Sequence, residues 1–362
     1  MDEPKTESPL HHLPFPDIET WETRKVLKYC AEAHRHLAEL KGMAASIPNE
    51  AILINTLALQ EAKDSSEIEN IVTTHDELYK EELQVEAYSN AAAKEVRNYV
   101  AALKHGFAQV RASKIIRIDD IVEIQQIIES NRAGLRKLPG TALKNQLTGE
   151  TIYTPPQHPE EILVLMNNLT AYINDDSTCD ADPLVKMALI HHQFESIHPF
   201  YDGNGRTGRI LNILYLVAQN LLELPVLYLS RYITRNKEPY YQELQNARKT
   251  GQWEPWLLYM LDSVSSTAQH TTRLIADIKA LMERYKQRIR EEQPKIYRQE
   301  LLNNLFNHPY TKIEFVMDDL QVTRLTATKY LETLVGMGLL KKEKLGRTNY
   351  YINQPLFDLF TQ

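Results

Sequence analysis

The sequence predicts a mainly α-helical protein with a small β-hairpin flap and a distinct C-terminal domain. Apolar residues recur at helical spacing along most of the chain up to Glu292. A stretch with glycines and short β-prone runs interrupts this pattern at residues 134–156, where we expect the flap. From about residue 296 the pattern changes to helix, turn, helix and two strands. These observations indicate helical layers with a small domain appended.

Composition restricts the class of protein. The chain has 362 residues, enough for two or three domains, with 43% hydrophobic and 25% charged residues. A net charge of −7 argues against a protein that coats nucleic acid or anionic membrane. Only Cys30 and Cys179 are present, which excludes a disulfide framework and a cysteine-based zinc site. Because no signal peptide or membrane span is evident, we expect a cytoplasmic protein.

The helical spacing also sets the order of the elements. Helices are expected at residues 21–40, 49–68, 74–106 with one break, 118–128, 159–173, 183–197, 210–221, 237–249, 253–266 and 268–292. Proline at residue 294 marks the end of the last of these helices.

The most informative segment is HPFYDGNGRTGR, at residues 198–209. It follows one predicted helix and runs into the start of another. Backbone N–H groups of Gly203, Asn204 and Gly205 can converge on an anion, because glycine permits positive φ and close approach. The dipole of the following helix adds partial positive charge at the same place. The segment therefore predicts a phosphate-binding loop.

Four charged or titratable side chains complete this loop. Arg206 and Arg209 lie three residues apart, so both face one side of the new helix and can donate to phosphate oxygens. Asp202 is placed to hold Mg²⁺ together with those oxygens. A neutral His198 can accept a proton near pH 7.

Other interpretations of this region are weaker. The substring GNGRTG fits the dinucleotide fingerprint G-x-G-x-x-G, but a helix precedes it and no βαβ pattern surrounds it. His191, His192 and His198 with Glu195 have no H-E-x-x-H spacing, so structural or substrate-lining roles are favoured over zinc. Phe200 is expected in the core.

The dodecapeptide resembles the signature of the Fic family, HxFx[D/E]GNGRxxR, at every defined position, and the resemblance covers most of residues 10–270. Fic enzymes typically transfer AMP from Mg-ATP to a Ser, Thr or Tyr hydroxyl of a protein. The resemblance implies that the flap, at residues 142–153, docks the target segment as an added strand. It implies that His198 is the general base, that Asp202 binds Mg²⁺, that Gly203, Asn204, Gly205 and Arg206 hold the α- and β-phosphates, that Arg209 pairs with the γ-phosphate, and that Tyr240 and Tyr241 lie near the nucleotide.

A second motif resembles the inhibitory helix of some Fic proteins, [S/T]xxxE[G/N], here Ser65, Glu69 and Asn70. The same stretch also fits a capping box. However, Glu61, Ser65 and Glu69 recur every four residues within a helix that has already begun, and Asn70 suits its left-handed C-terminal position. We therefore expect Glu69 to pair with Arg209 and inhibit the enzyme. The same Glu69 could orient a water and remove AMP, and the sequence does not rank the two directions.

The resemblance, the charged helix at residues 268–292 and the winged-helix order of elements after residue 296 together predict four segments. They are an N-terminal helical region with the inhibitory helix at residues 1–110, the Fic catalytic core at 111–270, a helical linker at 271–295 and a winged-helix domain at 296–362.

In a winged helix the second helix of the turn motif, here about residues 323–337, can enter the major groove of DNA. The balance of 8 Lys+Arg against 7 Asp+Glu from residue 296 to the end favours protein contact or packing over DNA. The residues that could contact DNA are Arg324, Lys329, Lys341, Lys342, Lys344 and Arg347.

The expected function is protein adenylylation, of a target or of the protein itself, by a mainly α Fic bundle with a winged-helix appendage. Family members that transfer phosphate or phosphocholine are the alternative among enzymes, and the intact GNGR favours AMP. A nucleotide-sensing transcriptional regulator acting through the winged helix is the alternative outside enzymes. The sequence leaves the target and a homodimer open.

Overall fold

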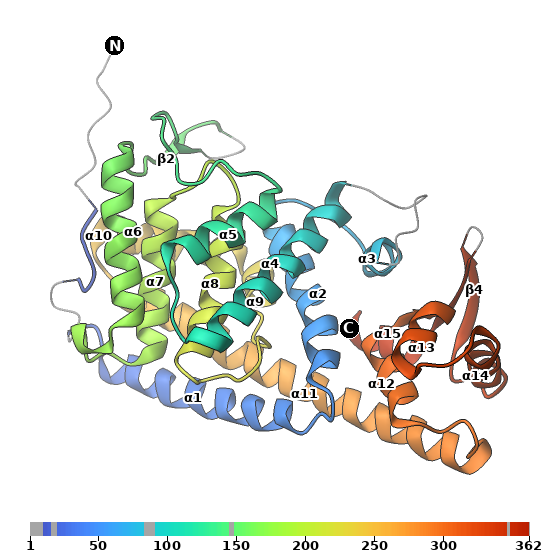
Figure 1. Ribbon diagram of the computed structural model, residues 1–362. Coiled ribbons are helices and arrows are strands. Elements are labelled where there is room, and N and C mark those ends of the chain that lie inside the picture. The colour runs from blue at the N-terminus through green and yellow to red at the C-terminus, as the bar shows by residue number, and fades with distance from the viewer. Residues whose placement is uncertain (1–9, 16–19, 83–90, 145–147, 346–347, 362) are drawn as a thin grey trace. The chain divides into compact units, whose positions relative to one another are not determined.

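The structure is a computed structural model that describes residues 10–15, 20–82, 91–144, 148–345 and 348–361. Within these residues the fold is mainly α, with two small antiparallel sheets, as predicted (Figure 1). None of the described helices is both long enough and apolar enough to cross a membrane.

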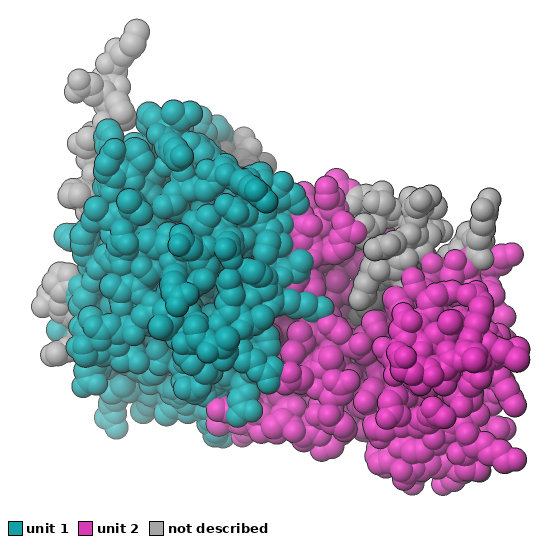
Figure 2. Space-filling model, viewed as in Figure 1, with its two compact units in different colours: residues 1–35, 101–223, 232–265 teal, residues 36–100, 224–231, 266–362 magenta. Residues whose placement is uncertain are grey.

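The chain forms two compact units whose segments alternate along the sequence (Figure 2). Unit 1 comprises residues 1–35, 101–223 and 232–265, and unit 2 comprises residues 36–100, 224–231 and 266–362. The predicted domains at 1–110, 111–270, 271–295 and 296–362 stay a prediction, since neither unit is one continuous stretch.

The helices follow the predicted order closely. They are α1 (Arg24–Ala45), α2 (Glu50–Ile68), α3 (His75–Glu82), α4 (Ala91–Ser113), α5 (Ile118–Glu129), α6 (Pro159–Asn174), α7 (Pro183–Ile197), α8 (Asn204–Ala218), α9 (Ser230–Arg235), α10 (Lys237–Thr250), α11 (Glu254–Glu292), α12 (Gln299–Asn307), α13 (Ile313–Leu320), α14 (Arg324–Gly336) and α15 (Gln354–Phe360).

Three differences from the predicted helices have physical reasons. α11 is one helix where two were expected, because its only proline, Pro255, lies in the first turn, no glycine follows, and only its surface changes from apolar to charged. α8 begins at Asn204, inside the phosphate-binding loop, rather than at residue 210. The six-residue α9 and a 3₁₀ turn at Asp176–Thr178 are too short to give a periodic signal.

In unit 1, α7 and α8 form the centre of the core. Every residue of α7 from Leu184 to Ile197 is buried. α7 packs against α6 and α8, and α8 also packs against α5. Asp182 caps α7 by accepting a hydrogen bond from Leu184 N at 2.8 Å, and Pro183 occupies its first turn. The loop between these two buried helices therefore has a rigid base.

The predicted flap is an antiparallel hairpin of β1 (Leu143–Lys144) and β2 (Thr151–Tyr153), with Leu143 opposite Tyr153. Residues 145–147 of the predicted flap lie outside the described residues. Tyr153 is buried, and its hydroxyl donates to Ser196 O at 2.9 Å. The base of the flap is thus joined to the end of α7.

In unit 2, the predicted inhibitory helix α2 packs against α12 of the C-terminal region. Asn55 Nδ2 donates to Asn307 Oδ1 at 2.5 Å across this contact. The Tyr310 hydroxyl likewise donates to Asp76 Oδ1, at 2.7 Å, near the start of α3. α2 is therefore part of the same packed body as the end of the chain.

The C-terminal region has the predicted order of helix, turn, helix and two strands. β3 (Tyr310–Lys312), β5 (Thr348–Ile352) and β4 (Lys341–Leu345) form one antiparallel sheet in that spatial order. Three of the basic residues considered for DNA pair within the region: Arg324 with Glu314 at 2.9 Å, Lys342 with Glu332 at 2.5 Å and Lys341 with Glu343 at 3.8 Å. Arg347 lies outside the described residues.

Candidate active site at the loop between two core helices

His198 is the C-terminal cap of α7. It has φ 48° and ψ 58°, in the left-handed region, and its N–H donates to Phe194 O at 2.9 Å. Pro199 follows, and a proline cannot continue a helix. The imidazole therefore leaves the backbone where α7 ends.

The next residues form a loop closed by its own side chains. Phe200 is fully buried beside Phe194, which confirms its predicted place in the core. Asn204 Oδ1 accepts from Phe200 N at 2.9 Å, and Asn204 Nδ2 donates to Phe200 O at 2.8 Å. Since the Asn204 side chain closes the loop, its backbone N–H is the group left to serve the predicted phosphate contact.

Gly203 begins α8 in a left-handed conformation, with φ 79°. Its N–H donates to Asp202 Oδ1 at 2.7 Å. The backbone angle favours glycine here, and a Cβ at this position would lie 2.8 Å from Glu129 Oε1 and displace that carboxylate. The first N–H groups of α8 have no partners within the helix and are thus available to an anion.

The Mg²⁺ contact of Asp202 stays a prediction, and the exposure of this carboxylate is compatible with it. Its side chain is 78% exposed. No group of three or more acidic, histidine or cysteine side chains among the described residues could hold a metal by itself. Mg²⁺ commonly takes one or two carboxylates and completes its shell with phosphate and water oxygens, so one exposed Asp202 fits this ion when a nucleotide is present.

Arg206 and Arg209 are both buried on α8. Arg206 Nη2 donates to Glu129 Oε1 at 2.6 Å, and Asp202 Oδ1 lies 3.9 Å from the same nitrogen. Glu129, the last residue of α5, was not predicted as a site residue. It lies 77 positions away in sequence, and no local spacing indicates the contact. Arg206 therefore holds a carboxylate where a phosphate contact was predicted.

The two histidines of α7 are part of the core. His191 Nε2 lies 2.8 Å from the Tyr240 hydroxyl, and burial, aided by Arg209, lowers the pKa of His191 to about 3. His192 Nε2 lies 3.2 Å from Leu244 O, and burial lowers its pKa well below the usual value. Their neutral rings are buried between α7 and α10 and hydrogen-bond across these two helices. This supports the structural interpretation over zinc binding.

The two tyrosines expected near the nucleotide differ in exposure. Tyr240 is 2% exposed, and its ring contacts Trp256 and Tyr259. Tyr241 is about half exposed. Tyr240 has a packing role in this cluster, and the nucleotide contact of both residues stays a prediction.

The end of α2 has the backbone that its motif predicts. Ser65 is buried, Glu69 is the exposed C-terminal cap, and Asn70 has φ 64° in the left-handed region. The predicted pair of Glu69 with Arg209 joins residues of different units and stays a prediction.

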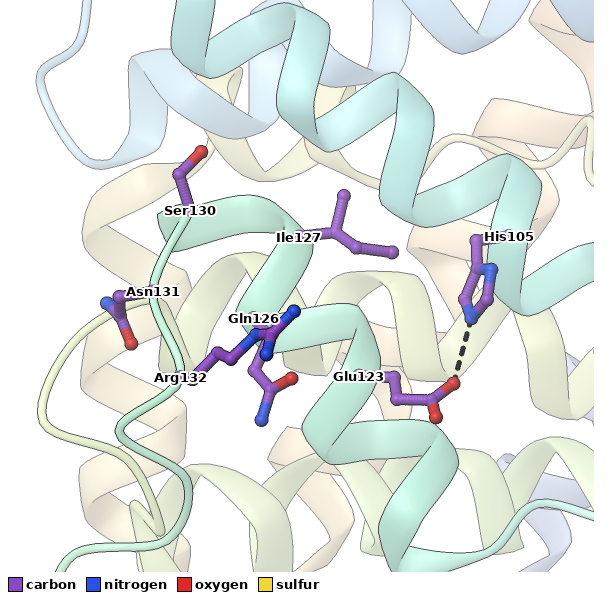
Figure 3. Close-up of a pocket in the computed structure, with 7 residues that line it drawn as sticks. All are labelled: His105, Glu123, Gln126, Ile127, Ser130, Asn131 and Arg132. Atoms are coloured by element: carbon purple, nitrogen blue, oxygen red, sulfur yellow. Dashed lines mark hydrogen bonds and ion pairs between the residues drawn. The ribbon is translucent and has the colours of Figure 1, made fainter.

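A groove of about 420 Å³ opens at the end of α5 (Figure 3). His105 Nε2 from α4 and Glu123 Oε2 from α5 lie 3.0 Å apart on one side of it. None of the predicted site residues is among its described lining, which consists of His105, Glu123, Gln126, Ile127, Ser130, Asn131 and Arg132. The groove is therefore not part of the predicted phosphate site.

Comparison with known proteins agrees with the signature. Residues 27–108 match the N-terminal region of the Fic/DOC family, residues 115–216 match the Fic/DOC family itself, and residues 281–356 match the C-terminal domain of SoFic-like protein adenylyltransferases. These matches follow one another along most of the chain. The chain belongs to the Fic/DOC family.

Individual relatives match over part of their length. The chain is 30% identical over 158 residues to protein adenylyltransferase fic-1 of Caenorhabditis briggsae, which covers 42% of this chain and 28% of the relative. It is 26% identical over 175 residues to protein adenylyltransferase Fic of Drosophila sechellia, covering 47% of this chain and 33% of the relative. The chain thus spans a third or less of the length of these relatives.

A solved structure shows the same fold. The crystal structure of a Fic family protein from Desulfovibrio desulfuricans aligns with a TM-score of 0.58 and 18% identity, covering 91% of this chain and 96% of that one. At this identity the likeness concerns the fold alone.

Proposed function

We propose that this protein transfers AMP from ATP to a Ser, Thr or Tyr hydroxyl of a protein, itself included. One observation carries the proposal. A single loop places His198 at the end of one core helix and two buried arginines at the start of the next. The adenylyltransferase names of the relatives support it.

The chemistry requires a base and an anion site. The target hydroxyl oxygen forms a bond to the α-phosphorus, the bond from that phosphorus to the bridging oxygen breaks, and pyrophosphate leaves. The hydroxyl proton moves to His198, which must be neutral to accept it. The first N–H groups of α8, with Arg206 and Arg209, hold the phosphates. Asp202 would hold Mg²⁺, which when bound offsets phosphate charge.

Glu69 is proposed to restrain this reaction by pairing with Arg209, whose guanidinium the γ-phosphate needs. A carboxylate accepts charge-assisted hydrogen bonds from a guanidinium much as a phosphate does, so Glu69 would compete with the nucleotide for the same donors. The same carboxylate could orient a water for the removal of AMP from a modified protein.

The test is incubation with Mg²⁺ and ATP labelled at the α-phosphate. The proteins are wild type, Glu69→Gly, Glu69→Gly/His198→Ala and, as a control on the same helix, Glu67→Ala. We expect Glu69→Gly to take up label about 10²-fold faster than wild type, because each 1.4 kcal/mol is tenfold in rate. The double variant should take up none, and Glu67→Ala should behave as wild type.

Label on the double variant would contradict the role of His198. Equal label on wild type and Glu69→Gly would contradict the restraint. No label on any form would overturn AMP transfer. The remaining functions would then be AMP removal and nucleotide-sensing regulation. Release of AMP from a modified protein would support the first, and binding to duplex DNA would support the second.

A further inference from the structure

Arg136, in the segment after α5, is a buried arginine with an unusual set of partners. It is 1% exposed, and no carboxylate within the described part of the chain lies at ion-pair distance from it. Its Nε donates to His198 O at 2.7 Å, and its Nη2 donates to Pro156 O at 2.8 Å and to Ile197 O at 3.4 Å. A full positive charge in the interior is thus directed at backbone carbonyls.

Two of those carbonyls, Ile197 O and His198 O, belong to the end of α7. The last carbonyls of a helix have no partners within the helix and need others. Here Ser196 O accepts from the Tyr153 hydroxyl, and Pro199 O accepts from Arg136 N at 2.8 Å. Ile197 O and His198 O accept from the guanidinium, so the four consecutive carbonyls of residues 196–199 all have hydrogen-bond donors. A cation at a helix C-terminus also interacts favourably with the helix dipole.

The same segment continues along the loop. The N–H groups of Lys137 and Leu138 donate to the Tyr201 hydroxyl at 2.9 and 3.1 Å. These two donors lower the pKa of Tyr201. Residues 136–138 therefore run beside residues 198–201, joined at the backbone of His198 and Pro199 and at the side chain of Tyr201.

His198 needs such support. A left-handed backbone costs a residue with a side chain about 1–2 kcal/mol, so it persists only where neighbouring groups hold it. The guanidinium of Arg136 hydrogen-bonds the carbonyl of that same residue. By fixing this peptide group, it fixes the direction in which the imidazole leaves the backbone.

We infer that Arg136 is a positioning residue for His198 and that it couples His198 to the flap through Pro156 O. This inference relies on the proposed function for the role of His198, while the contacts of Arg136 are independent of it. The planar guanidinium donates to Pro156 O at the flap base and to His198 O at the same time. A lysine ammonium lacks this fixed fork, so Arg136→Lys keeps the charge and loses the geometry.

The test introduces Arg136→Lys and Arg136→Met into the Glu69→Gly protein. Arg132→Met, an exposed arginine in the same segment (Figure 3), is the matched control. Self-labelling is measured against ATP concentration. The ring resonances of His198 are followed by NMR and assigned by their loss in His198→Ala. Melting temperature reports folding.

We expect Arg136→Lys to lower the labelling rate at saturating ATP by about 10²-fold, the effect of moving a catalytic group by about 1 Å. The ATP concentration for half-maximal rate should change by less than about twofold, because nucleotide binding is untouched. The His198 resonances should shift or split. Arg132→Met should change none of these quantities.

Unchanged His198 resonances and an unchanged rate per folded molecule in Arg136→Lys would overturn the inference, even with a lower melting temperature. If the Glu69→Gly protein takes no label, the proposed function fails, and the His198 resonances still decide the role of Arg136. Should the Arg136 variants not fold, Tyr201→Phe removes the acceptor for Lys137 and Leu138. It should shift the same resonances, and no shift would overturn the inference.

Discussion

Two buried charges, one in each unit, are stabilised in different ways. In unit 1, Arg206 lies against the carboxylate of Glu129, with 2.6 Å between Nη2 and Oε1. In unit 2, Glu61 of α2 is 1% exposed and accepts from the hydroxyls of Tyr99 at 3.0 Å and Ser230 at 2.5 Å. Ser230 N adds a third hydrogen bond at 3.2 Å.

The difference indicates what each charge is for. A carboxylate and a phosphate present similar oxygens to a guanidinium, so we expect a nucleotide to replace Glu129 at Arg206. The three hydrogen bonds to Glu61 named above come from hydroxyl and backbone groups of the fold, which no ligand replaces. Arg206 therefore suits an exchangeable anion site, and Glu61 suits a permanent anchor for the predicted inhibitory helix.

The largest expected effect comes from removing the anchor. Glu61→Ala leaves two buried hydroxyls and a backbone N–H without their acceptor, and we expect a loss of about 3 kcal/mol in the free energy of unfolding. Glu67→Ala on the same helix breaks a half-exposed pair with Lys63, at 3.1 Å, and should cost about 0.5 kcal/mol or less. Urea unfolding measures both, and equal losses would contradict the anchor.

A smaller effect tests whether the anion at Arg206 is exchangeable. Glu129→Gln leaves a buried guanidinium with a neutral partner, and we expect the protein without nucleotide to lose about 2 kcal/mol of stability. Mg-ATP should then raise the melting temperature of this variant more than that of wild type, because phosphate restores the missing charge. Glu123→Gln, an exposed position on α5, is the control. Equal shifts with Mg-ATP in wild type and Glu129→Gln would show that Glu129 and phosphate do not compete.

The effect that is smallest near pH 7 concerns histidines in the two units, because it develops only as the pH falls. Burial lowers the pKa of His191 in unit 1 to about 3 and that of His75 in unit 2 to about 4. The unfolded chain binds protons at these residues below about pH 6.5 while the folded chain does not, so stability falls as pH drops, by about 1.4 kcal/mol per pH unit for each histidine.

Urea unfolding between pH 7 and pH 5 measures this slope, which His191→Gln should make shallower. His34 has the opposite sign, because its hydrogen bond with Asp182 raises its pKa. Its stabilisation is present below about pH 6.5 and is lost as pH rises through the folded pKa. His34→Gln should therefore make the acid loss steeper. A His191→Gln slope equal to that of wild type would contradict a neutral, buried His191.

The sequence predicted those features of the fold and the site that depend on residues close together in the chain. The ends of α2 and α7 and the left-handed Asn70 follow from spacing and from local preferences. Glu129 and Arg136 could not be predicted, because they reach the loop from 77 and 62 positions away. An arginine that binds backbone carbonyls has no partner side chain whose spacing would indicate it.

The division into units was also beyond local reasoning. α2 precedes α12 by more than 200 positions, yet the two pack together in unit 2. Apolar periodicity shows that each helix has a face to bury, and it does not show which other face covers it. The same limit explains why the predicted domains were drawn as continuous segments.

The left-handed backbone of His198 has a consequence for protein engineering. Glycine or asparagine suits φ 48° better than histidine does, so a screen that selects only for thermal resistance would favour replacing the residue proposed as the base. The resulting protein would be more stable and would lack its proposed general base. Stabilised versions of this chain should therefore be sought by changes elsewhere, with position 198 held fixed.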